Sequence, residues 1–558
     1  MARGAVVLAV ALFGALALYH VRLPGVAAGE AAAVLPAMQL LQGAPLSPGL
    51  GVAVHLLGRA VPVMLADGGV ASTYAVVPLV WLLGVDVLAV RLGPILAGML
   101  AVLLTYHAGR RIYDRWVGVG AALLLAVFPA YLFWTRVGLA ASTHLVPLAL
   151  GIALAYLAWR GQGVPGGTRW LFLAGLLVGL ALATRLLFVW ALLALPAAYL
   201  ILLVADWLSE DRHAAYSARD TVELALDRLH RDLPLRGPRE ALAPLAGLLL
   251  GAVPVLAYAV VSRGSGRALR EHLFPPDRGD GAAGWESVQA AAEGSRALLR
   301  GSSLGFTGGV ADNPLYPWVL GLSALGLLIL VHRVPPLRRC RRSTVFLLGF
   351  AVVTAALSGV TGPSLAPTHL LLVLPIPQLT VAGFAAFGAR WLAPRLRARL
   401  RPALTTAAVV ALLVAPLIAR DLWLDVRYHR ALARTGGRGD FSSAIYDLAA
   451  YLDAHGVTRP YALDPGLPWR VMLLTEGRVA PVAITDAPSA PGADDAALRE
   501  ALTAPDPVFL VRGEDGRAAL RLTPLEQVVA ASGRTLRLEQ AFTQRDGTPV
   551  YFLFRVRP

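Results

Sequence analysis

Long apolar runs separated by short polar connectors dominate the first three-quarters of the chain. Many of these runs approach or exceed the roughly 20 residues that cross a bilayer as an α-helix. The clearest of them lie at 5–22, 88–108, 117–135, 142–159, 241–262, 344–360, 368–389 and 403–419. The pattern therefore predicts a polytopic α-helical membrane protein.

Three short arginine-rich connectors orient the expected spans. They are GRRIYDR at 109–115, RVPPLRRCRR at 333–342 and RWLAPRLRARLR at 390–401. Such connectors face the cytoplasm, according to the positive-inside rule. A count of eleven spans places all three on that side, with further spans at 170–184, 186–205 and 317–332. The predicted membrane domain is therefore 1–419, with outer loops at 23–87 and 263–316.

Two apolar segments near the N-terminus need separate interpretation. The run at 73–84 has only 12 residues, which is short for a span. We expect it to form a helix that lies in or under the outer membrane surface. The first segment, 5–22, has features of a signal peptide, with Arg3 before it and small residues at 27–29 after it. A retained first span is the simpler interpretation, because the rest of the chain is embedded in the membrane as well.

Residues 420–558 have denser charges and shorter apolar runs than the rest of the chain. Short buried strands are expected at 459–464, 479–485 and 506–513, with helices at 442–456, 494–504 and 523–533. The last segment, 534–556, has the pattern of a hairpin around the Asp546–Gly547 turn. Alternating strands and helices predict a small α/β domain on the extracytoplasmic side.

Composition supports membrane embedding and argues against several other classes. Of the 558 residues, 57% are hydrophobic and only 15% are charged, compared with about 25% charged in soluble domains. The net charge of +15 comes from arginine alone. Short basic connectors between spans explain that charge, so no nucleic-acid partner is expected.

Cofactor chemistry has little support in the sequence. Cys340 is the only cysteine, which rules out an intrachain disulfide and a cysteine-based zinc site. No metal-spaced His/Cys cluster occurs in the tail, and no Walker motif occurs in the chain, so neither a metal site nor ATP-driven transport is predicted. Cofactors are left open, without sequence support for a divalent metal.

An isolated carboxylate follows the first apolar run. Glu30 opens the segment EAAAVLPAMQLLQGAPL, which has the pattern of a short amphipathic helix that ends at Gly43 on the outer side. One interpretation is that this carboxylate meets a lipid headgroup. The other is that it stabilises the N-terminal turn through the helix dipole, worth about 0.3–1 kcal/mol.

Several weak motifs occur in a characteristic order. They are Arg91-Leu92-Gly93, Gly109-Arg110-Arg111, the segment from Pro129 to Thr135-Arg136, GLALATR at 179–185 and PTHLLLVLPIP at 367–377. Together, over roughly 1–420, they resemble the GT-C superfamily of membrane glycosyltransferases. The nearest likeness is to the protein mannosyltransferases and the lipid A aminoarabinose transferase. The resemblance implies transfer of a hexosyl or pentosyl unit from a polyprenyl-phosphate donor to an acceptor hydroxyl on the outer face. The acceptor could be a glycan, a lipid or a protein.

The acidic motif of that superfamily is incomplete here. Its first outer loop carries Asp-Glu, with a glycine thirteen residues after the glutamate. Glu30 and Gly43 keep this spacing, but Gly29 stands in the place of the aspartate. The second acidic residue that often follows the third span is also missing from RVGLAASTH at 136–144. The resemblance in fold is therefore stronger than the resemblance in catalytic residues.

The resemblance implies specific roles for four residues. Glu30 would act as the general base that accepts the acceptor's proton. Arg136, Arg185 and His369 fall at the outer ends of predicted spans, where they would bind the departing lipid phosphate. Basic residues at membrane borders also act as plain anchors, which is the alternative for each of the three. Asp312 is either a further polar contact or a residue of a loop turn.

Three functions of different classes remain open at this stage. The first is a glycosyltransferase in the cytoplasmic membrane of a bacterium, with the tail outside. The second is a catalytically silent GT-C-like protein that binds a lipid-linked glycan or a partner enzyme, which the substitution at Gly29 favours. The third is a lipid or solute transporter, although the chain has no evident internal repeat of the kind that transporters often carry.

Overall fold

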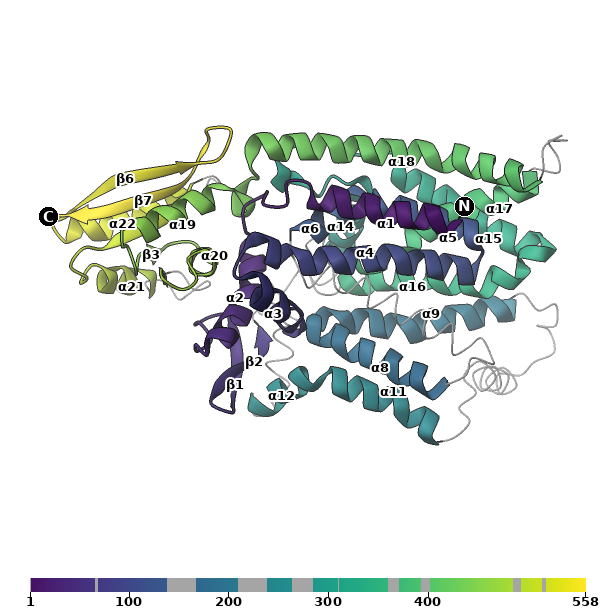
Figure 1. The fold of residues 1–558 in the computed structure, drawn as a ribbon, viewed down its shortest axis with the longest axis horizontal. Coiled ribbons are helices and arrows are strands. Elements are labelled where there is room, and N and C mark those ends of the chain that lie inside the picture. The colour runs from purple at the N-terminus through teal and green to yellow at the C-terminus, as the bar shows by residue number, and fades with distance from the viewer. Residues whose placement is uncertain are drawn as a thin grey trace.

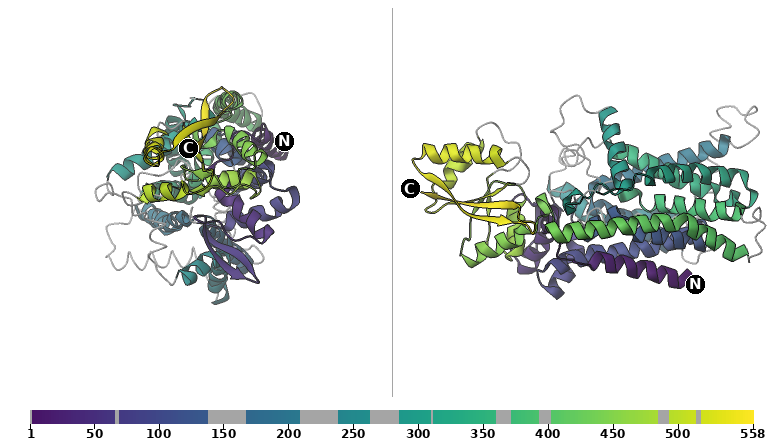
Figure 2. Two further views of the ribbon diagram at one scale, coloured as in Figure 1. Left: turned by 90° about the vertical axis from the view of Figure 1, so that its left-hand side faces the viewer. Right: turned by 90° about the horizontal axis from the view of Figure 1, so that it is seen from above.

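Helices with roughly aligned axes form a long bundle, and a β-sheet lies at one end of it (Figure 1). The computed structural model describes residues 2–65, 69–137, 167–208, 238–262, 285–309, 311–359, 371–392, 402–484, 493–513 and 518–558. The right-hand view of Figure 2 shows that the sheet projects beyond the ends of the helices. We refer to the end of the bundle beside this sheet as the sheet end, and to the opposite end as the connector end.

Within the described ranges, five helical segments are long and apolar enough to cross a membrane. They contain α4 (Val87–Ile112), α9 (Val189–Leu208), α15 (Tyr316–Arg333), α16 (Arg341–Gly359) and α17 (Ile376–Leu392). The number rises to seven if each of two bent helix pairs is one span. Three further helices lie at other predicted spans. Helices α1 (Ala2–Leu18) and α8 (Gly167–Thr184) are short, and α18 (Pro402–Thr435) is long. The predicted span at 142–159 lies outside the described residues, so the count of eleven stays a prediction.

Two spans predicted as continuous helices are bent instead. At 117–135, α5 (Arg115–Ala126) and α6 (Pro129–Arg136) meet at 57°. At 241–262, α11 (Pro238–Gly251) and α12 (Val253–Val261) meet at 62°. In each pair the second helix has a proline in its first two positions. Because proline has no N–H to donate to the preceding turn, it begins a new helix more readily than it continues one.

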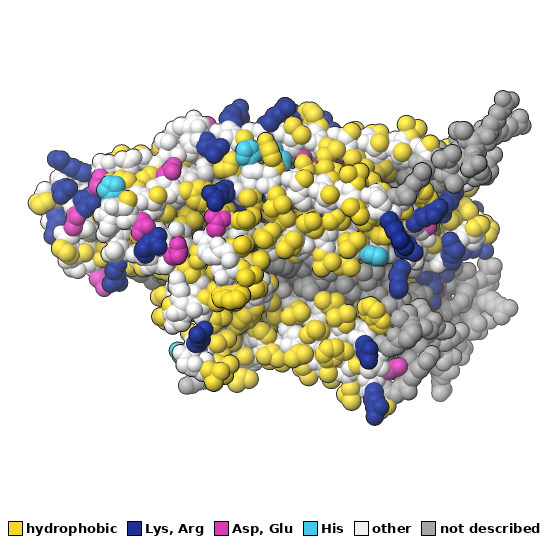
Figure 3. Space-filling view, in the orientation of Figure 1, with side chains coloured by type: hydrophobic (Ala, Val, Ile, Leu, Met, Phe, Trp, Pro, Cys, Tyr) yellow, Lys and Arg dark blue, Asp and Glu magenta, His cyan; other side chains and the backbone are white. Residues whose placement is uncertain are grey.

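The arginine-rich connectors meet at the connector end. Arg390 and Asp114, from two different connectors, form an ion pair of 2.5 Å. The Tyr113 hydroxyl lies 3.1 Å from the Thr344 hydroxyl, which joins the first connector to the helix that follows the second. In Figure 3, hydrophobic side chains cover most of the visible bundle, and charged side chains gather toward its two ends. The arrangement agrees with a bundle that spans a membrane; which end is cytoplasmic stays a prediction.

The segment between α1 and α4 is more structured than a loop. It contains α2 (Ala28–Gln42), α3 (Ala71–Leu83) and an antiparallel hairpin of β1 (Gly51–Leu56) and β2 (Arg59–Leu65). The sequence analysis did not predict this hairpin. Helix α3 has 13 residues, which agrees with a helix too short to span. Its orientation relative to the membrane stays a prediction.

Helix α2 differs from its predicted amphipathic character. It ends as predicted, with Gly43 in the left-handed region at φ 70°. However, most residues of the helix are buried, on all sides of it. It packs against α3 on one side and against α20 (Leu467–Leu474), which belongs to the tail, on another. A helix enclosed by other elements can be apolar all round, so the alanine-rich sequence needs no polar face.

The tail contains the predicted strands and helices around a five-stranded sheet of order β4-β3-β5-β7-β6. The β3–β4 and β3–β5 pairs are parallel, and the β5–β7 and β6–β7 pairs are antiparallel. The strands are β3 (Tyr461–Ala462), β4 (Val482–Ala483), β5 (Val508–Arg512), β6 (Thr535–Thr543) and β7 (Pro549–Arg557). The helices are α19 (Ala444–Ala454), α20, α21 (Ala493–Ala501) and α22 (Ala518–Ala531). The sequence analysis missed only α20 among these.

The predicted boundary between the two domains falls inside a helix. Helix α18 does not end with the predicted span at residue 419 but continues to Thr435. It therefore carries the chain from the connector end to the sheet in one rigid rod (Figure 1). The remaining elements are α14 (Trp285–Arg300) and the 3-10 helices η1 (Leu186–Phe188), η3 (Gly305–Thr307), η4 (Pro335–Cys340) and η6 (Gly439–Phe441).

Helices α8 and α11 approach each other through glycines. Gly175 and Gly179 on α8, and Gly247 and Gly251 on α11, are each four residues apart. A Cβ atom added at any of the four would collide with backbone atoms of the opposite helix. Small residues at this spacing let two membrane helices pack backbone to backbone, where van der Waals contact replaces the missing hydrophobic driving force.

We expect Gly179→Val to destabilise the protein, because the added side chain would force α8 and α11 apart. Overpacking of this kind costs typically about 1–3 kcal/mol. The midpoint of thermal unfolding in detergent measures the effect. Gly321→Val on α15 is the matched control, since a Cβ at Gly321 meets no atom within 4 Å. Equal midpoints for the two variants would contradict the close-packing interpretation.

We also expect opposite ends of the bundle to be accessible from opposite sides of the membrane. Single cysteines at Arg111 and Glu500, both exposed, are introduced into a Cys340→Ala background. A membrane-impermeant thiol reagent applied to intact cells should label Glu500→Cys and not Arg111→Cys. Labelling of both from one side would refute the predicted topology.

Candidate functional site

The segment that joins α1 to α2 lies at the sheet end, and two buried arginines hold it there. Arg91 comes from α4 and Arg136 from the last turn of α6. Neither arginine has any exposed surface. Their hydrogen bonds go to the backbone of residues 19–25, to Glu30 and, from Arg136, to His429.

Glu30 forms a bidentate ion pair with Arg91. Arg91 Nε donates to Glu30 Oε1 at 2.8 Å, and Arg91 Nη2 donates to Glu30 Oε2 at 3.0 Å. Glu30 Oε2 also accepts the backbone N–H of Ala27 at 2.8 Å, which caps the first turn of α2. Both side chains are fully buried. The carboxylate is therefore paired on both oxygens and has no contact with water.

Arg91 also binds backbone carbonyls. Its Nη1 donates to the carbonyl of Val21 at 2.7 Å, and its Nη2 lies 3.3 Å from the carbonyl of Gly25. A buried guanidinium needs acceptors for all of its N–H groups, because each unpaired group would pay its full desolvation cost. Arg91 therefore fixes the path of the segment as well as the position of Glu30.

Arg136 holds the same segment from the other side. Its Nη2 lies 2.7 Å from the carbonyl of Tyr19, 2.8 Å from that of His20 and 3.1 Å from that of Leu23. Its Nη1 lies 3.0 Å from Nδ1 of His429, on α18. Arg136 therefore links α6, the segment after α1, and α18.

The three charged groups form one electrostatic cluster. Arg136 and Arg91 both donate to carbonyls of residues 19–25, and Arg91 pairs with Glu30. Burial raises the pKa of Glu30 above its usual range, and the charge and hydrogen bonds of Arg91 act against that rise. The net charge of these three groups is +1 when all are ionised.

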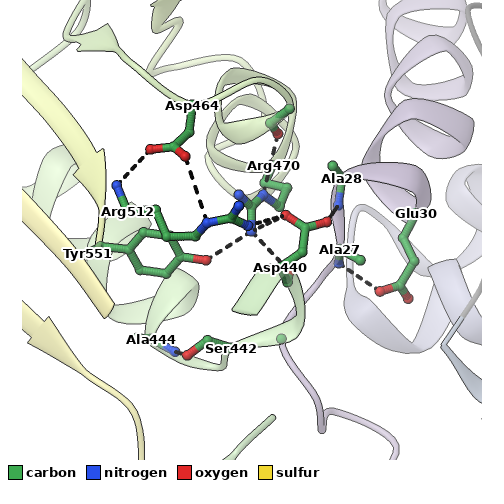
Figure 4. Close-up of polar contacts among 12 residues, drawn as sticks. Ala27, Ala28, Glu30, Asp440, Ser442, Ala444, Asp464, Arg470, Arg512 and Tyr551 are labelled. Atoms are coloured by element: carbon green, nitrogen blue, oxygen red, sulfur yellow. Dashed lines mark hydrogen bonds and ion pairs between the residues drawn. The ribbon is translucent and has the colours of Figure 1, made fainter. Parts of the chain in front are cut away.

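The tail contributes a second cap to α2. Asp440 Oδ2 accepts the backbone N–H of Ala28 at 3.1 Å. Its other carboxylate oxygen lies 3.2 Å from the guanidinium groups of both Arg470 and Arg512. Figure 4 shows Asp440 between the N-terminus of α2 and these two arginines. The tail and the Glu30 cluster are therefore parts of one polar network.

The other sequence-predicted residues lie elsewhere or outside the description. Arg185 is half-buried, in the turn between α8 and η1. The neighbouring carbonyl of Ala183 accepts the N–H of Val70 at 2.7 Å, so this turn packs against the first loop region. Asp312 forms an ion pair with Arg300, which agrees with a structural role in its loop. His369 lies outside the described residues.

The sequence analysis missed three residues of this region. It quoted Arg91 within a motif but did not assign it to the site, although a charge inside an apolar run requires a buried partner. It did not identify His429 or Asp425, which share one face of α18. Both Asp425 oxygens are buried without a hydrogen-bond partner. Within the described ranges, no group of three or more His, Cys, Asp or Glu residues could hold a metal ion.

Known proteins share this architecture. Solved structures of ArnT from Cupriavidus metallidurans match 99% of this chain and 98% of their own length at 15% identity. The TM-score is 0.55 for the apo state and 0.54 for the form bound to undecaprenyl phosphate. The chain has the GT-C fold of membrane glycosyltransferases.

Two further comparisons define the extent of the likeness. Residues 73–218 match the dolichyl-phosphate-mannose-protein mannosyltransferase family, a range that includes Arg91, Arg136 and Arg185. The oligosaccharyltransferase of Archaeoglobus fulgidus in the apo form gives a TM-score of 0.50 at 13% identity. That match covers 87% of this chain but only 64% of the archaeal one, so the chain spans less than two thirds of that relative. No curated protein sequence matches the chain.

We expect Arg91→Gln to lower the midpoint of thermal unfolding strongly. The variant would leave Glu30 as a buried carboxylate without its ion-pair partner, and breaking such a pair costs about 3–5 kcal/mol. The double variant Arg91→Met/Glu30→Gln should recover part of the loss, because it removes both charges.

The control for this prediction is Arg22→Gln. Arg22 pairs with Asp86 at 3.1 Å, but their side chains are 76% and 40% exposed. Exposed pairs contribute only about 0–1 kcal/mol. A loss at Arg91 no larger than the loss at Arg22 would show that the buried pair does not stabilise the fold.

Proposed function

We propose that this protein is a membrane glycosyltransferase that uses a sugar linked to a polyprenyl phosphate. The observation that carries the proposal is the match of nearly the whole chain to a protein solved with undecaprenyl phosphate. A buried carboxylate and two buried arginines at one end of the bundle support it. The acceptor would supply a hydroxyl, and the polyprenyl phosphate would be the leaving group.

The reaction requires a base for the acceptor proton and cations for the leaving phosphate. In this proposal Glu30 is the base, and its pair with Arg91 opens when donor and acceptor bind. Arg185, Arg136 and His369 are the proposed phosphate ligands. Arg185 is half-buried, whereas Arg136 has no exposed surface, so Arg185 is the first of the three to test.

A second candidate function is a catalytically silent protein that binds a lipid-linked glycan or a partner enzyme. The pairing of Glu30 favours this second function, because both of its carboxylate oxygens accept hydrogen bonds from Arg91 and its side chain has no exposed surface. In this second candidate function, Glu30 caps α2 and neutralises the charge of Arg91, and the protein keeps a binding surface for the lipid.

The decisive experiment measures donor binding and donor turnover separately. Purified protein in nanodiscs is incubated with radiolabelled polyprenyl-phosphate sugars and a cell-envelope extract that supplies acceptors. We expect release of free polyprenyl phosphate by the wild type. Glu30→Gln should lower the rate by about 10²–10⁴-fold, the typical contribution of a general base, while donor binding persists. Arg185→Gln should weaken donor binding, and Arg111→Gln, exposed at the connector end, should not.

Arg91→Gln separates catalysis from structure. It breaks the same ion pair as Glu30→Gln but keeps the carboxylate. If Glu30 is the base, turnover per donor-binding molecule falls much further in Glu30→Gln than in Arg91→Gln. Equal losses would assign Glu30 a structural role. Donor binding without turnover by the wild type would favour the silent binder, and the absence of both would refute the two candidate functions.

A further inference from the structure

A second polar site lies on α18, on the side of the helix that faces away from His429 and Arg136. It is a pocket of about 360 Å³ between this helix and the loop after η3. Its polar lining comes from Arg427, Tyr428, Arg430 and Arg434. We refer to it as the α18 arginine pocket. His429, which contacts Arg136, lies two residues after Arg427, roughly half a turn around the helix, so His429 and Arg427 face different sides of α18.

The charge of the pocket is uncompensated within the described ranges. Arg427, Arg430 and Arg434 are exposed, and no described carboxylate lies within ion-pair distance of any of them. Their spacing of three and four residues places them on one face of the helix. Three guanidinium groups around one cavity create a strong positive potential that an anion would neutralise.

The loop opposite the arginines is shaped to lie close to the helix. Gly308 has a φ of 76°, and a Cβ at Gly309 would lie 2.9 Å from the Cβ of Ala431 and 3.5 Å from the ring of Tyr428. The Tyr428 hydroxyl donates to the carbonyl of Gly301 at 2.8 Å and also contacts the carbonyl of Ala311. The wall of the pocket is therefore held in place by hydrogen bonds.

The surface beside the pocket suits a lipid. Trp423 lies one turn before Arg427 and is 43% exposed, and Val426 is 42% exposed. The guanidinium groups of Arg420 and Arg427 stack on the Trp423 ring, at 4.3 and 4.6 Å from its centroid. Exposed tryptophan beside arginine is typical of the membrane–water interface. The same helix continues from this point into the apolar part of the bundle.

We propose that the α18 arginine pocket binds the phosphate group of an anionic lipid headgroup in the leaflet at the sheet end. Guanidinium groups match phosphate oxygens in geometry as well as in charge. The cavity has room for a phosphate with a small polar substituent, and the apolar surface below Trp423 accepts acyl chains. This site is separate from the proposed donor site and does not depend on transfer activity.

Native mass spectrometry of the full-length chain in neutral detergent tests the proposal. The probes are phosphatidylglycerol, phosphatidylcholine and inorganic phosphate. We expect phosphatidylglycerol to bind the wild type about tenfold or more tightly than the variant Arg427→Gln/Arg430→Gln/Arg434→Gln, because three charge-assisted contacts are lost. Binding should weaken at high salt, since the arginines are exposed. The matching lysine substitutions should restore part of the affinity.

The control variant removes the same charge elsewhere. Arg459, Arg537 and Arg557 are exposed in the tail, and their simultaneous change to glutamine should leave lipid binding within about twofold. Equal affinity of the pocket variant and the wild type would overturn the proposal. Equal affinity for phosphatidylcholine would overturn the requirement for an anionic headgroup. Displacement of the lipid by equimolar inorganic phosphate would overturn the lipid assignment in favour of a free-phosphate site.

Discussion

The structure depends on how two buried arginines are neutralised. Arg91 and Arg136 have no contact with water, and a buried charge without partners would be far too costly to retain. One short segment, residues 19–25, supplies carbonyl oxygens to both, and Glu30 supplies the only carboxylate paired with either of them in the described ranges. Helix α1 ends at Leu18, just before this segment, and the carbonyls that follow accept hydrogen bonds from the two arginines.

The same segment connects the bundle to the tail. The N–H of Gly25 donates to the carbonyl of Phe441 at 2.8 Å, and the Tyr446 hydroxyl donates to the carbonyl of Arg22 at 2.9 Å. With Asp440 capping α2, these contacts tie the sheet to the segment that the arginines hold. A movement that releases Glu30 from Arg91 would also disturb these contacts. The tail and the segment beside Glu30 are therefore held together by one set of hydrogen bonds.

The sequence predicted the elements better than their junctions. Long apolar runs and the strand–helix alternation of the tail are local patterns, so helices α4, α9 and α15 lie at predicted spans and the strands of the sheet lie in the segments expected for them. The bend at Pro129 was missed because hydropathy does not change there, although a proline alone cannot continue the hydrogen-bond ladder. The helix beyond residue 419 was missed because its residues turn polar on one face while helical geometry persists.

The roles of the site residues stay predictions. Glu30 and Arg136 were chosen because they are charges in unusual places, and in the structure Arg91 pairs with Glu30 and shares the segment of residues 19–25 with Arg136. The partner of Glu30 is Arg91, which is 61 residues away, and no local pattern specifies a contact over that separation. Asp440 is more remote still, because its contact with Ala28 depends on how the tail docks onto the bundle.

Helix α18 borders both the Arg136 region and the arginine pocket, because one of its faces is buried in the bundle and the other is exposed. Asp425 and His429 point into the bundle, where His429 meets Arg136, while Arg427, Arg430 and Arg434 stay exposed. A helix that passes from an apolar environment into a polar one must change the character of its outer face at the boundary, and the change here falls near Trp423. Because the helix is continuous, the exposed arginine face and the His429–Arg136 contact belong to one element, so the same helix borders both the pocket and the segment that the arginines hold.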